Sequence, residues 1–161
     1  MNSRALLTIL AVVIVSGPVP AQFLEIPVLP SREAAWPPEQ TQASIELDGP
    51  YEAQLVASEP LISDPVEMTW DAKGRCFVAD MRDYPLGPPE GQKPLSRIVQ
   101  LLDPDKNGRY TKSKVFADHM DHVQGLLPHK DGLIATTRTQ ILFLRDTDGD
   151  GTADEIKPLV E

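Results

Sequence analysis

Acidic side chains alternate along residues 146–154, DTDGDGTAD, at a spacing that could hold a cation. Counted from Asp146, carboxylates stand at positions 1, 3, 5 and 9, and a glycine at position 6 permits the bend that brings them together. Hard oxygen ligands in this number suit Ca²⁺. The sequence therefore predicts a calcium loop with these ligands: Asp146, Asp148, Asp150, the carbonyl of Thr152, and Asp154. The alternative is an Asp-rich turn whose side chains bond their own backbone without a metal.

An EF-hand is excluded, because Lys157 stands at position 12, where that motif needs a bidentate Glu, and no helical pattern flanks the loop. The pattern D-x-D-x-D-G-x-x-D instead resembles the calcium loops between strands of integrin-type repeats. A weaker copy begins at Asp103, with Asp105 and Asn107 at positions 3 and 5 but Thr111 at position 9. Since this copy has fewer carboxylates, we expect it to bind calcium less tightly.

The segments that must position these loops read as short strands. Runs rich in Val, Ile, Leu and Phe, such as RCFVAD, RIVQLL, GLIATT and QILFLR, alternate with turn sequences such as DAKG and HKDG. YEAQLVA, which begins at Tyr51, belongs to the same set of runs. No apolar stripe at helical spacing competes with them. The sequence therefore predicts an all-β fold.

These runs repeat along the chain. The stretch from Asp64 aligns with that from Asp121, and the stretch from Arg97 aligns with that from Gln140. A unit of about 40 residues with four short strands is typical of a β-propeller blade. Residues 49–161 are therefore predicted to form the first two blades of an incomplete propeller, one at about 64–118 and the other at about 121–161. A propeller needs about four to eight blades, so the missing blades are expected in a longer chain.

The N-terminal residues are predicted to direct export. Residues 1–21 have a basic start, a short apolar run and a small-residue cleavage signal, which is the layout of a secretory signal peptide. The alternative is an uncleaved membrane anchor, although the run is too short to cross a bilayer comfortably. Residues 22–48 are rich in proline and lack periodicity, so an extended linker is expected there. We expect a periplasmic or extracellular protein with no membrane span after cleavage.

Charge and cysteine content exclude several classes. The formal net charge is −9 and the isoelectric point is near 4.7, so the surface repels phosphate backbones and nucleic acid is not an expected partner. The single Cys76 cannot form an internal disulfide, and its strand-like surroundings favour a buried apolar role. No G-x-S-x-G, P-loop or G-x-G-x-x-G motif occurs, which argues against hydrolase, NTPase and Rossmann chemistry.

The order of segments, from LVASEPL through DPV and ADMRDYP to DTDGDGTADE, carries a resemblance. It resembles the opening of the membrane-bound dehydrogenases of planctomycetes and verrucomicrobia, whose propeller is similar to the soluble glucose and sorbosone dehydrogenases. The resemblance covers about residues 49–161 and implies an oxidoreductase that acts on sugar-like alcohols. Members often continue to a c-type haem domain with a C-x-x-C-H motif. This chain has no such motif, so haem or a quinone-type cofactor is implied only for a longer product.

In a propeller, the insertion MRDYPLGPPEGQKPLS and the segment DHMDHVQG before the second blade would open on one face. They contribute these candidate site residues: Arg82, Asp83, Tyr84, His119 and His122. We expect His122 to act as general base in the oxidation of an alcohol, Arg82 to hold a carboxylate or cofactor anion, and Tyr84 to line the site. The structural alternative is that the histidines only form hydrogen bonds and that Arg82 pairs with Asp83.

Other functions stay open at this point. His119 and His122, together with Asp118 and Asp121, have a local spacing that could suit zinc, but no third convergent ligand is evident. A propeller without catalytic activity could bind carbohydrate or another protein through the same face. A truncated product without a function of its own is the third possibility.

Overall fold

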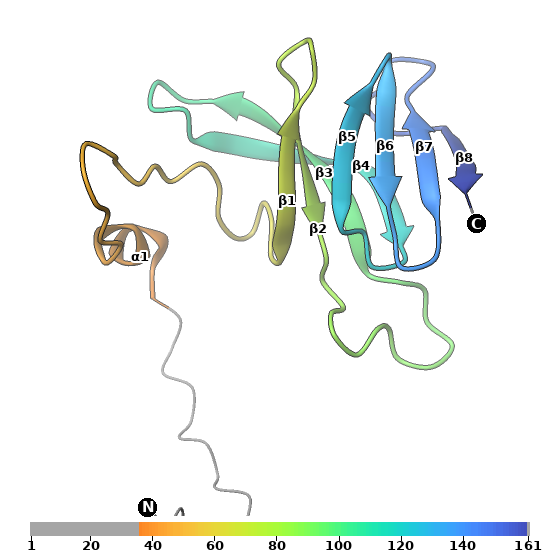
Figure 1. Cartoon of the computed structure of the whole chain (residues 1–161), viewed down its shortest axis with the longest axis horizontal. Coiled ribbons are helices and arrows are strands. Elements are labelled where there is room, and N and C mark those ends of the chain that lie inside the picture. The colour runs from red at the N-terminus through yellow and green to blue at the C-terminus, as the bar shows by residue number, and fades with distance from the viewer. Residues whose placement is uncertain (1–35, 161) are drawn as a thin grey trace, which may run out of the picture. The chain divides into compact units, whose positions relative to one another are not determined.

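The computed structural model describes residues 36–160, which fold into two four-stranded antiparallel sheets (Figure 1). The first sheet has the order β1-β2-β3-β4 and the second the order β5-β6-β7-β8, so each strand pairs with the next one along the chain. The first sheet consists of β1 Pro65–Trp70, β2 Cys76–Asp80, β3 Ser96–Pro104 and β4 Tyr110–Met120. The second consists of β5 Gly125–His129, β6 Gly132–Thr136, β7 Ile141–Arg145 and β8 Glu155–Val160. The all-β prediction is confirmed, and the described residues form no closed barrel.

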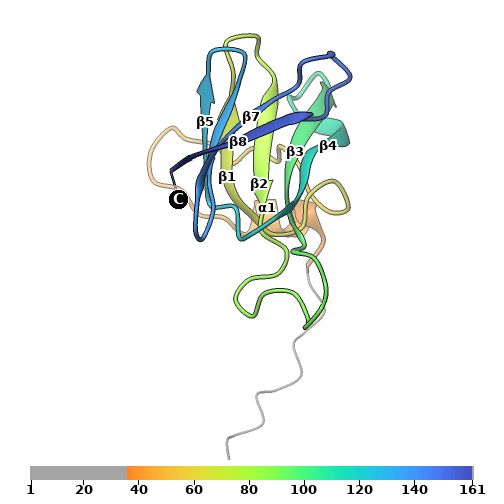
Figure 2. The ribbon, with the colours of Figure 1, turned by 90° about the vertical axis from the view of Figure 1, so that its right-hand side faces the viewer.

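A single core joins the two sheets. Phe77 on β2 and Phe116 on β4 pack edge to face, with ring centroids 5.0 Å apart, because aromatic quadrupoles favour that arrangement. Their cluster continues into the second sheet through buried side chains that include Leu126, Leu133 and Leu144. Figure 2 shows the second sheet lying across the first. The sheets therefore stabilise each other by burying one apolar face of each.

The outer face of the first sheet is covered by the chain itself. Cys76, Val78, Val99 and Leu101 form a second buried cluster against Ala57, Leu61 and Ile62. The run YEAQLVA therefore lies in a segment that covers a sheet, although its composition suggested a strand. It forms none, because the only backbone hydrogen bond between it and the first sheet runs from Tyr110 N–H to the Val56 carbonyl, 2.8 Å.

One short helix precedes the sheets. Helix α1, Pro38–Ala43, begins after Pro37 and has proline at its first position, where the missing N–H costs nothing. It lies inside the segment expected to be an extended linker, and six residues are too few for a periodic pattern to predict it. Within residues 36–160 no helix has the length and hydropathy needed to cross a bilayer. The predicted signal peptide lies outside the described residues.

Three connections meet at one end of the sheets. The β2–β3 loop, the β4–β5 segment and the β6–β7 turn all lie at the lower end of the sheets in Figure 1. The β3–β4 and β7–β8 turns, which contain the two predicted calcium loops, lie at the other ends of their strands. An antiparallel meander forces this separation, because successive turns alternate between the two ends of a sheet. The candidate chemistry is thus divided between the two ends.

Candidate functional site

A cleft of about 430 Å³ lies where these three connections meet. The β2–β3 loop provides one wall, and the β4–β5 segment and the β6–β7 turn provide the other. The lining residues are Tyr84, Pro85, Leu86, Gly87, Pro88, Asp121, His122, Gln124 and Arg138. Sequence segments about 40 residues apart thus converge on one cavity that contains ionisable and aromatic side chains.

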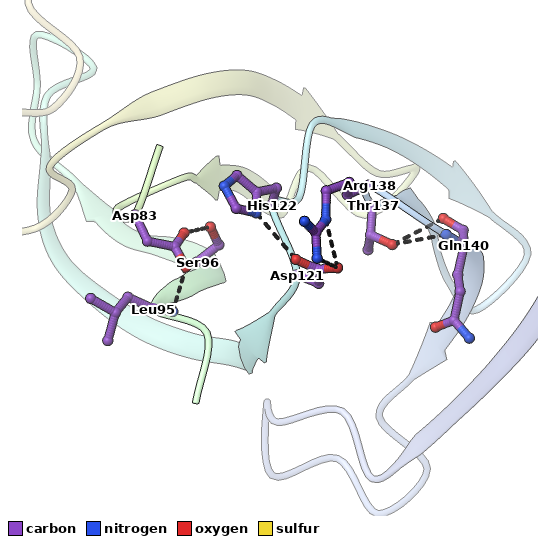
Figure 3. Close-up of polar contacts among 8 residues, drawn as sticks. All are labelled: Asp83, Leu95, Ser96, Asp121, His122, Thr137, Arg138 and Gln140. Atoms are coloured by element: carbon purple, nitrogen blue, oxygen red, sulfur yellow. Dashed lines mark hydrogen bonds and ion pairs between the residues drawn. The ribbon is translucent and has the colours of Figure 1, made fainter. Parts of the chain in front are cut away.

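One carboxylate organises the polar groups of the cleft (Figure 3). Asp121 Oδ1 lies 3.1 Å from His122 Nδ1, and Asp121 Oδ2 accepts a hydrogen bond of 3.2 Å from Arg138 Nε. The Arg138 N–H also donates to the Asp121 carbonyl at 3.0 Å, so backbone and side chain together fix this pair. The His122 side chain is only 10% exposed. Asp121 therefore favours the tautomer with the proton on Nδ1, which leaves Nε2 as an acceptor.

The backbone at His122 has a left-handed conformation, with φ of 49°. A non-glycine residue with positive φ is uncommon and costs energy, and such residues cluster at functional sites. His119 shares this conformation, with φ of 56°. The segment that joins the two sheets is thus strained at His122, the residue that carries the imidazole of the cleft.

Asp83 closes the loop that forms the first wall. Its carboxylate accepts hydrogen bonds from Leu95 N–H at 3.0 Å and from the Ser96 hydroxyl at 2.5 Å, as Figure 3 shows. Burial alone would raise the pKa of Asp83, but these hydrogen bonds outweigh it and hold the pKa below its ordinary value. The residue is therefore ionised at neutral pH. Its charge is one of those near His122.

The predicted site residues divide into two groups. Tyr84 and His122 both line the cleft, and the Tyr84 side chain is 69% exposed and available to a ligand. Arg82 is exposed and does not line the cleft. His119 turns toward the β2–β3 loop instead, with its Nδ1 3.0 Å from the Pro94 carbonyl.

Sequence reasoning did not assign Arg138 and Gln124 to the site, and it considered Asp121 only as a zinc ligand. Arg138 occupies the β6–β7 turn, where a charged residue is ordinarily read as solvated. The pairing with Asp121 depends on the path of the backbone between two sheets. The one available signal was that the β6–β7 turn occupies the same place in the second unit as the long insertion does in the first.

The β7–β8 loop brings together three of the five predicted calcium ligands. Carboxylate oxygens of Asp146, Asp148 and Asp150 lie within 4.8 Å of one another. They also accept hydrogen bonds from their own loop, for example from Gly149 N–H to Asp146 at 2.7 Å. Burial would raise the pKa of Asp146, but the N–H groups that point at it outweigh this effect and lower the pKa.

Further contacts hold this loop together and tie it to β4. Asp154 accepts hydrogen bonds from the Thr147 N–H at 2.9 Å and the Thr147 hydroxyl at 2.5 Å. Lys114 on β4 donates to the Asp150 carbonyl and lies 3.9 Å from its carboxylate. The loop thus contains both the convergent carboxylates of a cation site and the internal hydrogen bonds of a metal-free turn.

The weaker loop has a different arrangement. Asp103 forms an ion pair with Lys112 at 2.8 Å. Asp105 accepts hydrogen bonds from the N–H groups of Asn107 and Arg109 at 2.8 and 2.9 Å. Within residues 36–160, the only convergent group of three or more His, Cys, Asp and Glu side chains is the one in the β7–β8 loop. The structure therefore does not gather Asp118, His119, Asp121 and His122 into a zinc site.

Cys76 is fully buried on β2. Burial raises the pKa of its thiol, and the Tyr110 hydroxyl offsets this only in part. The thiol is thus neutral at physiological pH and is a packing element of the first sheet.

Comparison with known proteins identifies one family. A family model described as a domain of unknown function, DUF7133, matches residues 37–161. No curated protein and no solved structure matches the chain significantly. The match begins at the start of helix α1 and includes both sheets and all the residues of the cleft. Because it spans most of the chain, the protein belongs to the DUF7133 family.

Proposed function

We propose that this chain is the exported N-terminal part of a β-propeller that binds a sugar-like alcohol in the His122 cleft and, in the full-length protein, oxidises it. The observation that carries the proposal is the contact of 3.1 Å between His122 Nδ1 and Asp121 in a cleft lined by Tyr84. A buried imidazole oriented by a carboxylate is an arrangement that can remove a proton from a hydroxyl group.

The propeller architecture is supported by the way in which the two sheets meet. Phe77 and Ile134 stand at equivalent positions of the two repeats, and so do Cys76 and Leu133. In the first sheet, Phe77 belongs to the core between the sheets. In the second sheet, Leu133 belongs to that core, and Leu133 is the equivalent of Cys76 rather than of Phe77. Opposite faces of the repeat therefore pack together. Such a head-to-tail contact can continue from unit to unit and closes into a ring where the rotation allows.

The free face of the second sheet supports further units. By strand register, Leu127, Ile134 and Phe143 lie side by side on the face that points away from the first sheet. Leu127 is 59% exposed, although the equivalent face of the first sheet is buried. An apolar sheet face of this kind fits a third sheet, which would come from the missing blades of a longer chain.

Proton removal is the part of the oxidation that the residues of the cleft can perform. Since Nδ1 is directed to Asp121, Nε2 is the ring nitrogen that can accept the hydroxyl proton of a bound alcohol. An anionic quinone-type cofactor does not fit this cleft, because Arg138 is the only Arg or Lys among the lining residues and it is paired with Asp121. Covalent haem does not fit either, because Cys76 is buried in the core. No electron acceptor is therefore assigned to the cleft.

The proposal predicts separate effects on turnover and on binding. His122→Gln in the full-length protein should lower the rate of dye-linked oxidation of D-glucose or D-mannitol by about a hundredfold or more, because the general base is lost. Sugar affinity, measured by NMR titration, should change little. His119→Gln is the matched control, since that side chain does not line the cleft. Unchanged turnover in His122→Gln would contradict the role of His122.

A non-catalytic binding module is the second candidate. The exposed Tyr84 ring favours it, because an aromatic surface beside polar groups suits a carbohydrate that is held without being changed. Sugar binding that Tyr84→Ala abolishes and Tyr84→Phe retains, with no turnover in any dye-linked assay, would favour this function over the enzyme.

We also propose that the β7–β8 loop binds calcium in a structural role, through Asp146, Asp148 and Asp150. The three convergent carboxylates support this, because hard oxygen ligands suit Ca²⁺. Calorimetric titration with CaCl₂ should detect one site, and Asp148→Ala should abolish it while Asp105→Ala leaves it intact. Lys114→Met should strengthen binding, because it removes a cation 3.9 Å from the Asp150 carboxylate. Heat equal to that of dilution would leave the metal-free turn as the better account.

A further inference from the structure

The cleft has an unusual balance of charge for a site with an exposed arginine. Arg138 has a side chain that is 65% exposed, and it would ordinarily be read as an anchor for a carboxylate or phosphate group. Its Nε and Nη2, however, both lie 3.2 Å from Asp121 Oδ2. One carboxylate thus neutralises the guanidinium before any ligand binds.

A second carboxylate lies close to the cleft. Asp83 lies behind the first wall, where its carboxylate is bonded to Leu95 and Ser96. No Lys or second Arg lines the cleft to balance it. The ring of His122 is directed to Asp121 rather than to a ligand carboxylate. A ligand with its own negative charge would therefore meet two carboxylates and only one cation, which is already paired.

The hydrogen-bonding groups of the cleft suit hydroxyl groups instead. Arg138 retains N–H donors that Asp121 does not use, and His122 Nε2 is an acceptor. Gln124 adds an amide, which both donates and accepts. A hydroxyl group can donate and accept at once, whereas a carboxylate can only accept. Neutral sugars and polyols can thus satisfy both kinds of partner.

We infer that Asp121 is a specificity-determining residue, which pairs with Arg138 so that the cleft accepts uncharged polyhydroxylated ligands and rejects acidic sugars. This inference rests on the proposed function, since it names the ligand class of the same cleft. Arg82, to which the sequence assigned an anion, takes no part in it, because it does not line the cleft.

The test compares D-glucose with D-glucuronate, which differ in one carboxylate, by NMR titration of the full chain. The wild-type protein should bind glucose about tenfold more tightly or better, which is the scale of one unscreened charge repulsion in a partly solvated site. Asp121→Asn should leave the positive charge of Arg138 unpaired. The preference for glucose over glucuronate should then shrink by about tenfold or reverse. Asp118→Asn is the matched control, because Asp118 is an exposed carboxylate near the end of β4 that lies outside the cleft.

A second measurement needs no substitution. Raising the NaCl concentration should strengthen glucuronate binding, because salt screens the repulsion, and should leave glucose binding unchanged. Glucuronate binding that equals or exceeds glucose binding, or that weakens with salt, would overturn the inference and leave the proposed sugar site standing. Failure of both sugars to bind would overturn the proposed function and this inference with it.

Discussion

Phe77→Ala is expected to lower the free energy of unfolding by about 3–5 kcal/mol, the range for removing a large buried aromatic side chain. Phe77 is only 1% exposed and contacts Phe116 edge to face at 5.0 Å. Its cluster includes Leu126, Leu133 and Leu144 of the second sheet. The cavity left by the substitution would therefore lie in the core that both sheets share, and neither sheet could close it alone.

Urea unfolding and amide hydrogen exchange would measure this effect. Because the core is shared, faster exchange is expected in β6 as well as in β2 of the variant. Phe77→Leu should cost less than about 1.5 kcal/mol, because it keeps most of the apolar volume. Leu86→Ala should change stability by no more than about 0.5 kcal/mol, since Leu86 is 94% exposed. A loss of protection from hydrogen exchange that is confined to β1–β4 would show that the sheets are stable independently of each other.

Local composition was sufficient to predict most of the fold. Strands β2, β3, β6 and β7 coincide with runs of Val, Ile, Leu and Phe, because their residues face apolar surroundings and their ends carry turn residues. The same rule was wrong for YEAQLVA at residues 51–57. Ala57 at its end packs against the first sheet, but composition cannot tell whether a neighbouring strand will offer a ladder of hydrogen bonds.

The candidate site was predictable in part. Alternation of turns between the ends of a meander was enough to bring the Tyr84 loop and the His122 segment together. The contacts around His122 were not predictable. The sequence allows Asp121 to face solvent, a zinc ion or Arg138, and its pairing with Arg138 depends on the positive φ of the backbone at His122. A sequence pattern records spacing along the chain, whereas these contacts depend on how two sheets pack.

Asp80→Ala is expected to cost about 3–5 kcal/mol, because removing one partner of a buried ion pair leaves the other charge uncompensated. The Asp80 side chain is completely buried, and its Oδ2 accepts a hydrogen bond of 2.9 Å from Arg97 Nε. Its Oδ1 accepts hydrogen bonds from the N–H groups of Ser63 and Asp64 at 3.0 and 2.8 Å. One carboxylate thus joins the start of β1, the end of β2 and the start of β3.

The position of this network links stability to the cleft. The chain leaves β2 at Asp80 and enters the loop that forms the first wall, and Met81 N–H donates to the Asp64 carbonyl at 2.9 Å. Loss of the Asp80 carboxylate should therefore loosen the wall that carries Tyr84 as well as the sheet. Sugar affinity in Asp80→Ala should fall even under conditions in which the protein remains folded.

A double-mutant cycle would separate the ion pair from the backbone contacts. Asp80→Leu combined with Arg97→Met removes both charges, so it should be more stable than Asp80→Leu alone by about 1–3 kcal/mol. Full recovery is not expected, because the N–H groups of Ser63 and Asp64 would still lose their acceptor. If the losses of unfolding free energy in the two single variants add up to the loss in the double variant, the pairing of Asp80 with Arg97 is contradicted. The carboxylate would then act only by holding the backbone before β1, and Arg97 would be free to vary without any cost to the fold.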